Sequence, residues 1–449
     1  MRGWWPFSGP SIEGSRSPLW AGPTAAAATA VVLALVLVRI SPFGDGALAP
    51  FIGDMDAASG LLQVTATSVM TAATLTFSLT VVALQLASQQ FSPRLLREFT
   101  HDALTKRVLG VLAGAFSYSV VVLVSLEGDA VPRIAILTAL VFALASLGAI
   151  LSFITHIVRM IRVDSMMLMV HDDTSSAIER FYPPWHDESR TPDDLALDET
   201  QARKLFGQKS GFIQKVDVPR LVTVAREAGA LVRLEVRPGD HLVRQTPMAS
   251  VWPTDVDGAR LDDDLDELAE RVQAALTIGY ERSMDQDAAF GLRQLEDVAV
   301  KAMSPSINDP VTADHAVGHM GDLLVRIMGC RLGATVHTDD DGASRAIVPD
   351  RDLRYYFDLC CGQLRRFGAA EPTVLMSLLR MLRDVAVACR TEEQRDEVRR
   401  AALLVATENG DLRDSDAAAV KDLHERVELA LAGSVTEAFA DRAGETRSI

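Results

Sequence analysis

The residues with the chemistry of a binding site gather between positions 280 and 312. Charged and amide side chains follow one another closely there, and a Ser-Pro-Ser-Ile-Asn-Asp-Pro run comes after them. Such a density of charge is typical either of ion pairs that support a helix or of a pocket for a charged ligand. The candidate residues for a regulatory pocket are Arg282, Asp285, Gln286, Asp287, Arg293, Ser304, Asn308, Asp309 and Thr312.

Two histidines that follow this run have a spacing that can bind metal. His315 and His319 are four residues apart, and Asp322 lies seven residues after His315, so all three share one helix face. The glutamate of a zinc-protease motif is missing between the histidines, and the sequence fixes no further ligand. A solvated helix face explains the same spacing, and we expect no metal and no cofactor.

Sequence motifs of enzymes are missing from the chain. It has no GxGxxG, no phosphate loop that ends in Gly-Lys-Ser/Thr and no GxSxG. Its cysteines form no CxxC pair, which favours reduced thiols in a helical core: Cys330, Cys360, Cys361 and Cys389. We therefore expect no enzymatic activity.

The charges divide the chain into two unlike parts. Residues 1–165 carry 10 Lys and Arg against 9 Asp and Glu, whereas residues 166–449 carry 34 against 51. A soluble enzyme with one core is not divided in this way. The acidic part also excludes a nucleic-acid partner, which needs a basic face to displace counterions from phosphates.

Four uncharged runs predict four transmembrane helices that contact the lipid bilayer. Residues 17–38, 57–93, 108–126 and 134–155 contain 22, 37, 19 and 22 residues. About 20 apolar residues, at a rise of 1.5 Å each, cross a hydrocarbon core of about 30 Å. The predicted spans are about 20–39, 61–92, 108–126 and 134–158.

The second run is too long for a simple span. As one helix it would extend for about 55 Å, so it must tilt, bend or continue beyond the membrane. Its polar residues fall within about 60° of arc at 100° per residue: Thr67, Thr71, Thr74, Ser78, Gln85 and Gln89. This polar stripe is a candidate pore lining, but Ser and Thr also pack transmembrane helices, and Thr65, Thr76 and Thr80 lie on roughly the opposite face.

The spans carry no acidic or basic residue near the middle of the membrane. Proton-coupled carriers usually keep an ionisable residue there, so this pattern counts against a proton pump. A channel built from hydroxyls, amides and backbone remains compatible with it.

The second half of the chain has a strand pattern followed by helices. Phe212–Val216, Leu231–Arg237 and Met248–Trp252 read as strands, and Pro238-Gly239-Asp240 is a turn signal. This rhythm resembles half of a lipoyl-like barrel-sandwich domain without its modified lysine. The expected fold class is therefore a four-helix membrane domain followed by a cytosolic α+β region.

This pattern gives the following predicted organisation. The parts are a cytosolic tail 1–16, a membrane domain 17–162, a helix extension and acidic linker 163–208, a small β module 209–254, a helical domain 261–441 and a tail 442–449. Asn308-Asp309-Pro310 is expected to start a helix, because Pro is favoured at the first helical position.

Several runs resemble a bacterial membrane-protein family that is catalogued as domain of unknown function 2254. The Phe-Ser-Leu-Thr-Val-Val-Ala-Leu-Gln-Leu-Ala-Ser-Gln-Gln-Phe-Ser-Pro-Arg run at 77–94 carries most of the resemblance. Residues 152–162, 210–252 and 286–313 add to it in the same order, so it covers most of residues 25–430. The resemblance implies several spans and a soluble C-terminal half, and it supplies no activity.

Two classes of function remain. The first is an oligomeric channel or transporter in the bacterial plasma membrane, with a cytosolic gating or vestibule domain. The second is a membrane-anchored sensor or scaffold whose cytosolic half binds a ligand or partner. The sequence identifies neither the ion nor the ligand. Self-association as a homo-oligomer is expected in both classes, because one four-helix bundle leaves little room for water.

The distribution of Lys and Arg predicts that both termini and the large acidic half are cytoplasmic. The loop after the second span holds Arg94, Arg97, Lys106 and Arg107, whereas residues 41–59 hold no Lys or Arg. In a cysteine-free background, a membrane-impermeant thiol reagent added to intact cells should label Pro50→Cys but not Ala440→Cys. Labelling at position 440 from outside would reject this topology.

Overall fold

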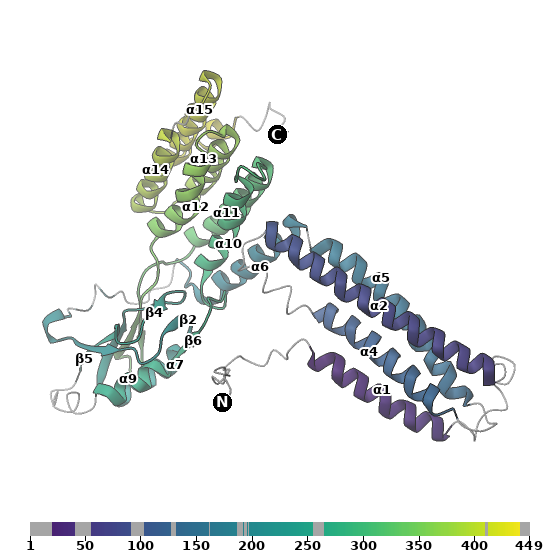
Figure 1. Ribbon diagram of the computed structural model, residues 1–449. Coiled ribbons are helices and arrows are strands. Elements are labelled where there is room, and N and C mark those ends of the chain that lie inside the picture. The colour runs from purple at the N-terminus through teal and green to yellow at the C-terminus, as the bar shows by residue number, and fades with distance from the viewer. Residues whose placement is uncertain are drawn as a thin grey trace, which may run out of the picture. The chain divides into compact units, whose positions relative to one another are not determined.

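The chain forms two compact units, residues 1–162 and residues 163–449. A computed structural model describes residues 20–40, 55–90, 103–126, 132–160, 162–185, 192, 195, 197–254, 265–408 and 412–440, with side chains omitted for 86–90. Figure 1 shows the helices of the first unit and the strands and helices of the second. Each unit is described here by itself.

The described residues of the first unit form four long helices. All four are apolar and long enough to cross a membrane, which confirms the prediction from the uncharged runs. They are α1 (Ala21–Ile40), α2 (Met55–Gln90), α4 (Ala103–Val124) and α5 (Arg133–Met160). The 36 residues of α2 form one continuous helix, which at 1.5 Å per residue is about 54 Å long.

Helix α4 is the centre of this unit, because its contacts with α1 and with α2 are more extensive than those of α5, and it also packs against α5. Gly110 and Gly114 face α1 at this contact, where a Cβ atom at Gly114 would lie 3.6 Å from the Cβ of Ala30, an ordinary van der Waals distance. On another side, the Tyr118 hydroxyl donates a 2.9 Å hydrogen bond to the Ala135 carbonyl of α5. Small residues and one buried hydroxyl thus hold the helices together.

The second unit contains two β-sheets. Strand order in the first is β1-β5-β3-β8-β7, with β3 and β8 parallel and the other neighbours antiparallel; strand order in the second is β4-β2-β6. The strands are β1 (Arg203–Phe206), β2 (Gly211–Val216), β3 (Ala230–Leu234), β4 (His241–Leu242), β5 (Pro247–Pro253), β6 (Leu276–Gly279), β7 (Thr335–Thr338) and β8 (Ser344–Val348).

This arrangement does not confirm a barrel-sandwich module within residues 209–254. The strands of that range are divided between the two sheets, and β6, β7 and β8 come from the range that we predicted as helical. β1 likewise lies in the predicted linker. Pairing of Val232 with Ala346 joins segments that are far apart in sequence, so no local sequence pattern predicts this pairing.

Two short helices complete the core of the sheets. They are α7 (Val218–Glu227) and α9 (Leu265–Gln273), and the turn η4 (Glu199–Gln201) precedes β1. Leu221 of α7 and Val272 of α9 are fully buried in the same cluster as Val232 of β3. The apolar sides of these helices therefore exclude water from the sheets.

The other helices of the second unit agree with the helical pattern of the sequence. They are α6 (Val163–Phe181), α10 (Ala288–Ala302), α11 (Pro310–Met328), α12 (Leu353–Phe367), α13 (Pro372–Ala386), α14 (Glu392–Thr407), α15 (Asp414–Leu431) and α16 (Val435–Ala438). α11 begins as predicted, since Asp309 is its N-cap and accepts a 3.1 Å hydrogen bond from the Thr312 amide.

Helix α10 packs against α6 at a glycine. A Cβ atom at Gly291 would lie 1.7 Å from the Thr174 hydroxyl oxygen, a distance that no packed side chain can adopt. Thr174 is fully buried and donates to the Val170 carbonyl of its own helix. The close approach of α6 and α10 therefore depends on the absence of a side chain at position 291.

We predict that Gly291→Ala destabilises the protein by about 1–3 kcal/mol, because it overpacks this contact. The matched control is Gly318→Ala, where the new methyl group meets nothing within 4 Å and helix propensity favours Ala. Thermal unfolding of the full chain in detergent should show a lower midpoint for Gly291→Ala alone. A second change, Thr174→Ala, should recover part of the loss. Equal midpoints for the two single variants would contradict the analysis.

Candidate functional sites

The polar stripe of α2 lies on the outside of its unit. Thr67, Thr71, Thr74, Ser78 and Gln85 are all exposed, and the side chain of Gln89 lies outside the described residues. On the opposite face, Thr65 and Thr76 are only 6% and 4% exposed, and Thr80 is half-buried. That second face therefore packs within the chain, which does not favour the alternative prediction that it serves a neighbouring subunit.

The stripe is longer than the sequence analysis supposed. Gln63 is exposed and falls on the same side of the helix at 100° per residue. Gln63 and Gln85 are separated by about 33 Å along the axis, close to the hydrocarbon thickness of a bilayer. Between them, the hydroxyls of Thr71 and Thr74 donate to the carbonyls of Thr67 and Met70, one turn earlier.

The candidate residues of the second unit do not form one pocket. The first group surrounds Asp287, whose side chain is fully buried. The Arg282 guanidinium donates two hydrogen bonds to its Oδ2 atom, at 2.6 and 3.0 Å, and Arg351 Nη1 lies 3.4 Å from its Oδ1 atom. Burial raises the pKa of Asp287, and the two guanidinium groups act against that rise.

The charges continue beyond Arg351 into the turn after β3. Arg351 Nη2 lies 3.6 Å from Asp240 Oδ1, and Asp240 also accepts a 3.2 Å hydrogen bond from Arg237 Nε. Both arginines stack over the ring of Tyr355. We call the five alternating charges the ion network: Arg282, Asp287, Arg351, Asp240 and Arg237.

Gly239 allows the turn to reach the ion network. Its φ of +87° belongs to the region that favours glycine, and a Cβ atom there would lie 2.0 Å from Asp287 Oδ2. The glycine of the predicted Pro-Gly-Asp turn is thus required twice, by its backbone conformation and by the space that the carboxylate occupies.

Residues next to the ion network make further polar contacts within the second unit. The Gln286 amide replaces a strand partner, because it accepts a 2.8 Å hydrogen bond from Val216 N and donates one of 3.2 Å to Val216 O. The buried hydroxyls of Tyr182 and Tyr356 share a 2.8 Å hydrogen bond beside it. Burial also raises the pKa of Asp350 to about 6. Asp285 is exposed, and no hydrogen bond or ion pair of its side chain is found among the described residues.

The remaining motif residues lie at two other places. Arg293 of α10 pairs with Glu296 on the same helix. Ser304 belongs to the connection between α10 and α11, where Asn308 has a φ of +47°. The hydroxyl and amide of Thr312 hold the pKa of Asp309 below its usual value, as expected for a helix cap.

His315 and His319 face α6. His315 Nδ1 lies 3.5 Å from an Asp164 oxygen, and the His319 ring lies 5.3 Å from the ring of His171. His171 Nε2 in turn is 2.8 Å from Asp322 Oδ2. Within the described ranges, no group of three or more His, Cys, Asp and Glu residues is placed to hold a metal ion. These residues join two helices.

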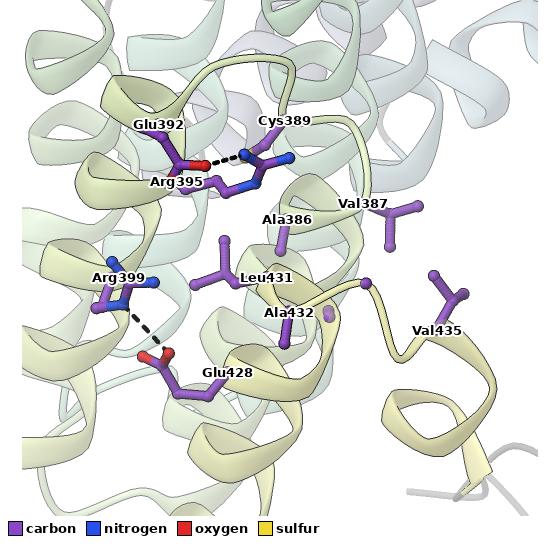
Figure 2. Close-up of a pocket in the computed structure, with 12 residues that line it drawn as sticks. Ala386, Val387, Cys389, Glu392, Arg395, Arg399, Glu428, Leu431, Ala432 and Val435 are labelled. Carbon is purple, nitrogen blue, oxygen red and sulfur yellow. Dashed lines mark hydrogen bonds and ion pairs between the residues drawn. The ribbon is translucent and has the colours of Figure 1, made fainter.

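A pocket of about 450 Å³ lies among α13, α14 and α15 (Figure 2). Its lining is partly apolar, with Leu431 between the two charged sides. Arg395 pairs with Glu392, and Arg399 pairs with Glu428 at 3.2 Å. Since the two arginines of the lining face two glutamates, the charges are matched within the pocket.

One family model matches parts of both units of the chain. Residues 16–384 match the family model described as a predicted membrane protein, DUF2254. The chain belongs to this family. The match confirms the resemblance carried by the run at 77–94.

Relatives in this family come from mycobacteria. An uncharacterised protein of Mycobacterium bovis and one of Mycobacterium tuberculosis are each 31% identical over 396 residues, which cover 86% of this chain and 75% of the relative. No solved structure matches the chain. The family match therefore supports a membrane protein and leaves its activity open.

Sequence reasoning found only part of the ion network. Arg282 and Asp287 were candidates, but Arg351, Asp240 and Arg237 were not. The Pro-Gly-Asp turn was the one signal that could have pointed to Asp240. Arg351 stands just before α12 in an ordinary helix-start pattern, and only the tertiary fold brings it to Asp287.

We predict that Asp287→Asn destabilises the protein strongly, by about 3–5 kcal/mol, because it leaves buried guanidinium groups without their carboxylate. The matched control is Asp285→Asn, two residues earlier and exposed, which should change stability by less than about 0.5 kcal/mol. Thermal unfolding midpoints of the full chain at neutral pH check both. If the two variants unfold at the same temperature, the ion network does not stabilise the unit.

Proposed function

We propose that this protein is an oligomeric channel- or transporter-like membrane protein in which copies of α2 surround a shared polar path. One observation carries the proposal: the polar stripe lies opposite the face by which α2 packs in its own chain. No other described helix of the chain covers the stripe. A second molecule, or water that a second molecule shelters, is therefore its most favourable neighbour.

The length of the stripe is what makes it informative. A single threonine facing lipid is common, because its hydroxyl bonds to a carbonyl of the same helix, as Thr29 of α1 does at 2.9 Å. Hydroxyls and amides aligned over about 33 Å present a polar line through the hydrocarbon. Polar groups there are stabilised by other helices or by a water-filled cavity.

The residues beside the stripe fit contacts between copies. At 100° per residue, Met70 and Phe77 lie on one side of it, and Leu75 and Val82 lie on the other. All four are exposed, with Phe77 and Leu75 at 64% and 65%. Apolar margins on both sides would let neighbouring copies pack while the stripe faces their common axis, as closed rotational symmetry requires.

The soluble unit has the role of a gate or vestibule in this proposal, and no catalysis is assigned to it. The Lys and Arg bias places it with both termini on the cytoplasmic side of the bacterial plasma membrane. In the alternative, a membrane-anchored sensor or scaffold, the stripe joins copies without forming a path.

Reconstitution separates these possibilities. Purified protein in liposomes loaded with potassium chloride should release K⁺ or Cl⁻, measured with ion-selective electrodes. Thr74→Leu with Ser78→Leu should reduce the release to that of empty liposomes, because it makes the middle of the stripe apolar. The matched control is Thr29→Leu with Thr155→Leu, two exposed threonines of α1 and α5 that make the same hydrogen bonds to their own helices.

The oligomeric state of the same samples decides between the two explanations of a loss of ion release. An assembly that survives the Thr74 and Ser78 changes but loses release supports a path, whereas dissociation supports the scaffold. Wild-type protein that is a monomer in nanodiscs, or release that is unchanged in the stripe variant, contradicts the proposal.

A further inference from the structure

A second pocket in the soluble unit differs from the first in its charge. It has a volume of about 420 Å³ and lies between α10, α12 and α14. Its lining includes two carboxylates, from Glu296 and Asp358, and four guanidinium groups, from Arg293, Arg365, Arg366 and Arg400. A surplus of positive charge is notable in a region where acidic residues outnumber basic ones by 51 to 34.

Three of the arginines are fixed by ion pairs. Arg293 pairs with Glu296, whose side chain is 1% exposed, and Arg365 pairs with Glu408. These contacts hold two guanidinium groups against the pocket before any ligand arrives. Such preorganisation lowers the side-chain entropy that the protein loses when a ligand binds.

Arg400 is fixed in the same way, from two sides. Its Nη2 atom lies 2.8 Å from Asp358, and its Nε atom lies 2.7 Å from Glu397. Glu397 is shared, because Arg354 also donates to it at 2.6 and 3.0 Å. The carboxylates around the pocket therefore pair with three of its four lining arginines and leave one guanidinium charge without a partner among the described residues.

Arg366 carries that charge. It is exposed at the pocket, and it makes no hydrogen bond or ion pair with the described part of the chain. Its side chain is free to turn toward a ligand, next to guanidinium groups that are already in place. In the first pocket, by contrast, each lining arginine has a glutamate of the same lining as its partner.

We propose that this second pocket binds a small anion that carries phosphate or carboxylate groups, with Arg366 as its recruiting residue. Guanidinium groups match both kinds of oxyanion through paired N–H donors. A volume of 420 Å³ lies within the range of small-molecule sites. The inference gives the soluble unit a ligand class, and it is independent of whether the membrane unit conducts ions.

Isothermal titration of the full chain in detergent tests the inference, with pyrophosphate and citrate as separate probes in a buffer of 0.15 M chloride, about the physiological ionic strength. Wild-type protein should bind at least one of them. Arg366→Gln should weaken that binding about tenfold or more, the loss expected for a charge-assisted contact. The matched control is Arg395→Gln in the first pocket, which removes the same charge and should leave affinity unchanged.

Binding of pyrophosphate alone identifies a phosphate ligand, binding of citrate alone a carboxylate ligand, and binding of both a general oxyanion site; each supports the inference. Arg366→Lys keeps the charge and loses the paired donors, so it should bind with intermediate affinity. If Arg366→Gln unfolds at a lower temperature than wild type, Arg366→Lys takes its place in the test. Absence of binding by both probes, or equal weakening in Arg366→Gln and Arg395→Gln, overturns the inference.

Discussion

The carboxylate of Asp287 imposes the strongest single constraint on the second unit. A carboxylate that is shut off from water must be balanced by positive groups where it lies, and here these groups come from other segments of the chain. Arg282 precedes α10, and Arg351 precedes α12. Through Asp240, the turn between β3 and β4 joins them, and Gly239 leaves the space that the carboxylate occupies. The ion network therefore fixes how sheets and helices meet.

The sequence predicted the elements whose causes are local. Uncharged runs located the four apolar helices, Asp309-Pro310 located the start of α11, and the Pro-Gly-Asp turn followed β3. Pairing of β3 with β8 has no local cause, because its partners Val232 and Ala346 are joined by a long stretch of chain. The barrel-sandwich interpretation is not confirmed for this reason: β3 pairs with the distant β8 as well as with its neighbour β5.

Candidate sites show the same limit. Clustering in sequence grouped Arg282, Asp287, Arg293 and Asp309 as one motif, but the fold sends them to three places. Successive residues of one helix point in different directions, so Arg293 faces a pocket with α12 and α14 while Asp287 faces Arg351. Periodicity also showed that the residues of the polar stripe share a face of α2, without telling which face packs. That choice depends on small and apolar residues such as Ala58, Leu62 and Ala83, which are buried against the other helices.

The two units differ in where their polar groups find partners, and this difference indicates which unit has a physical reason to contact another molecule. In the second unit, the charges of the ion network pair with one another inside one chain. In the membrane unit, the polar stripe faces away from the other described helices, and the hydroxyls of Thr71 and Thr74 donate to carbonyls of their own helix. A lipid neighbour offers these groups no hydrogen bond, whereas a second copy or enclosed water does. Since the described helices leave this face uncovered, the membrane unit gives the stronger physical reason for self-association.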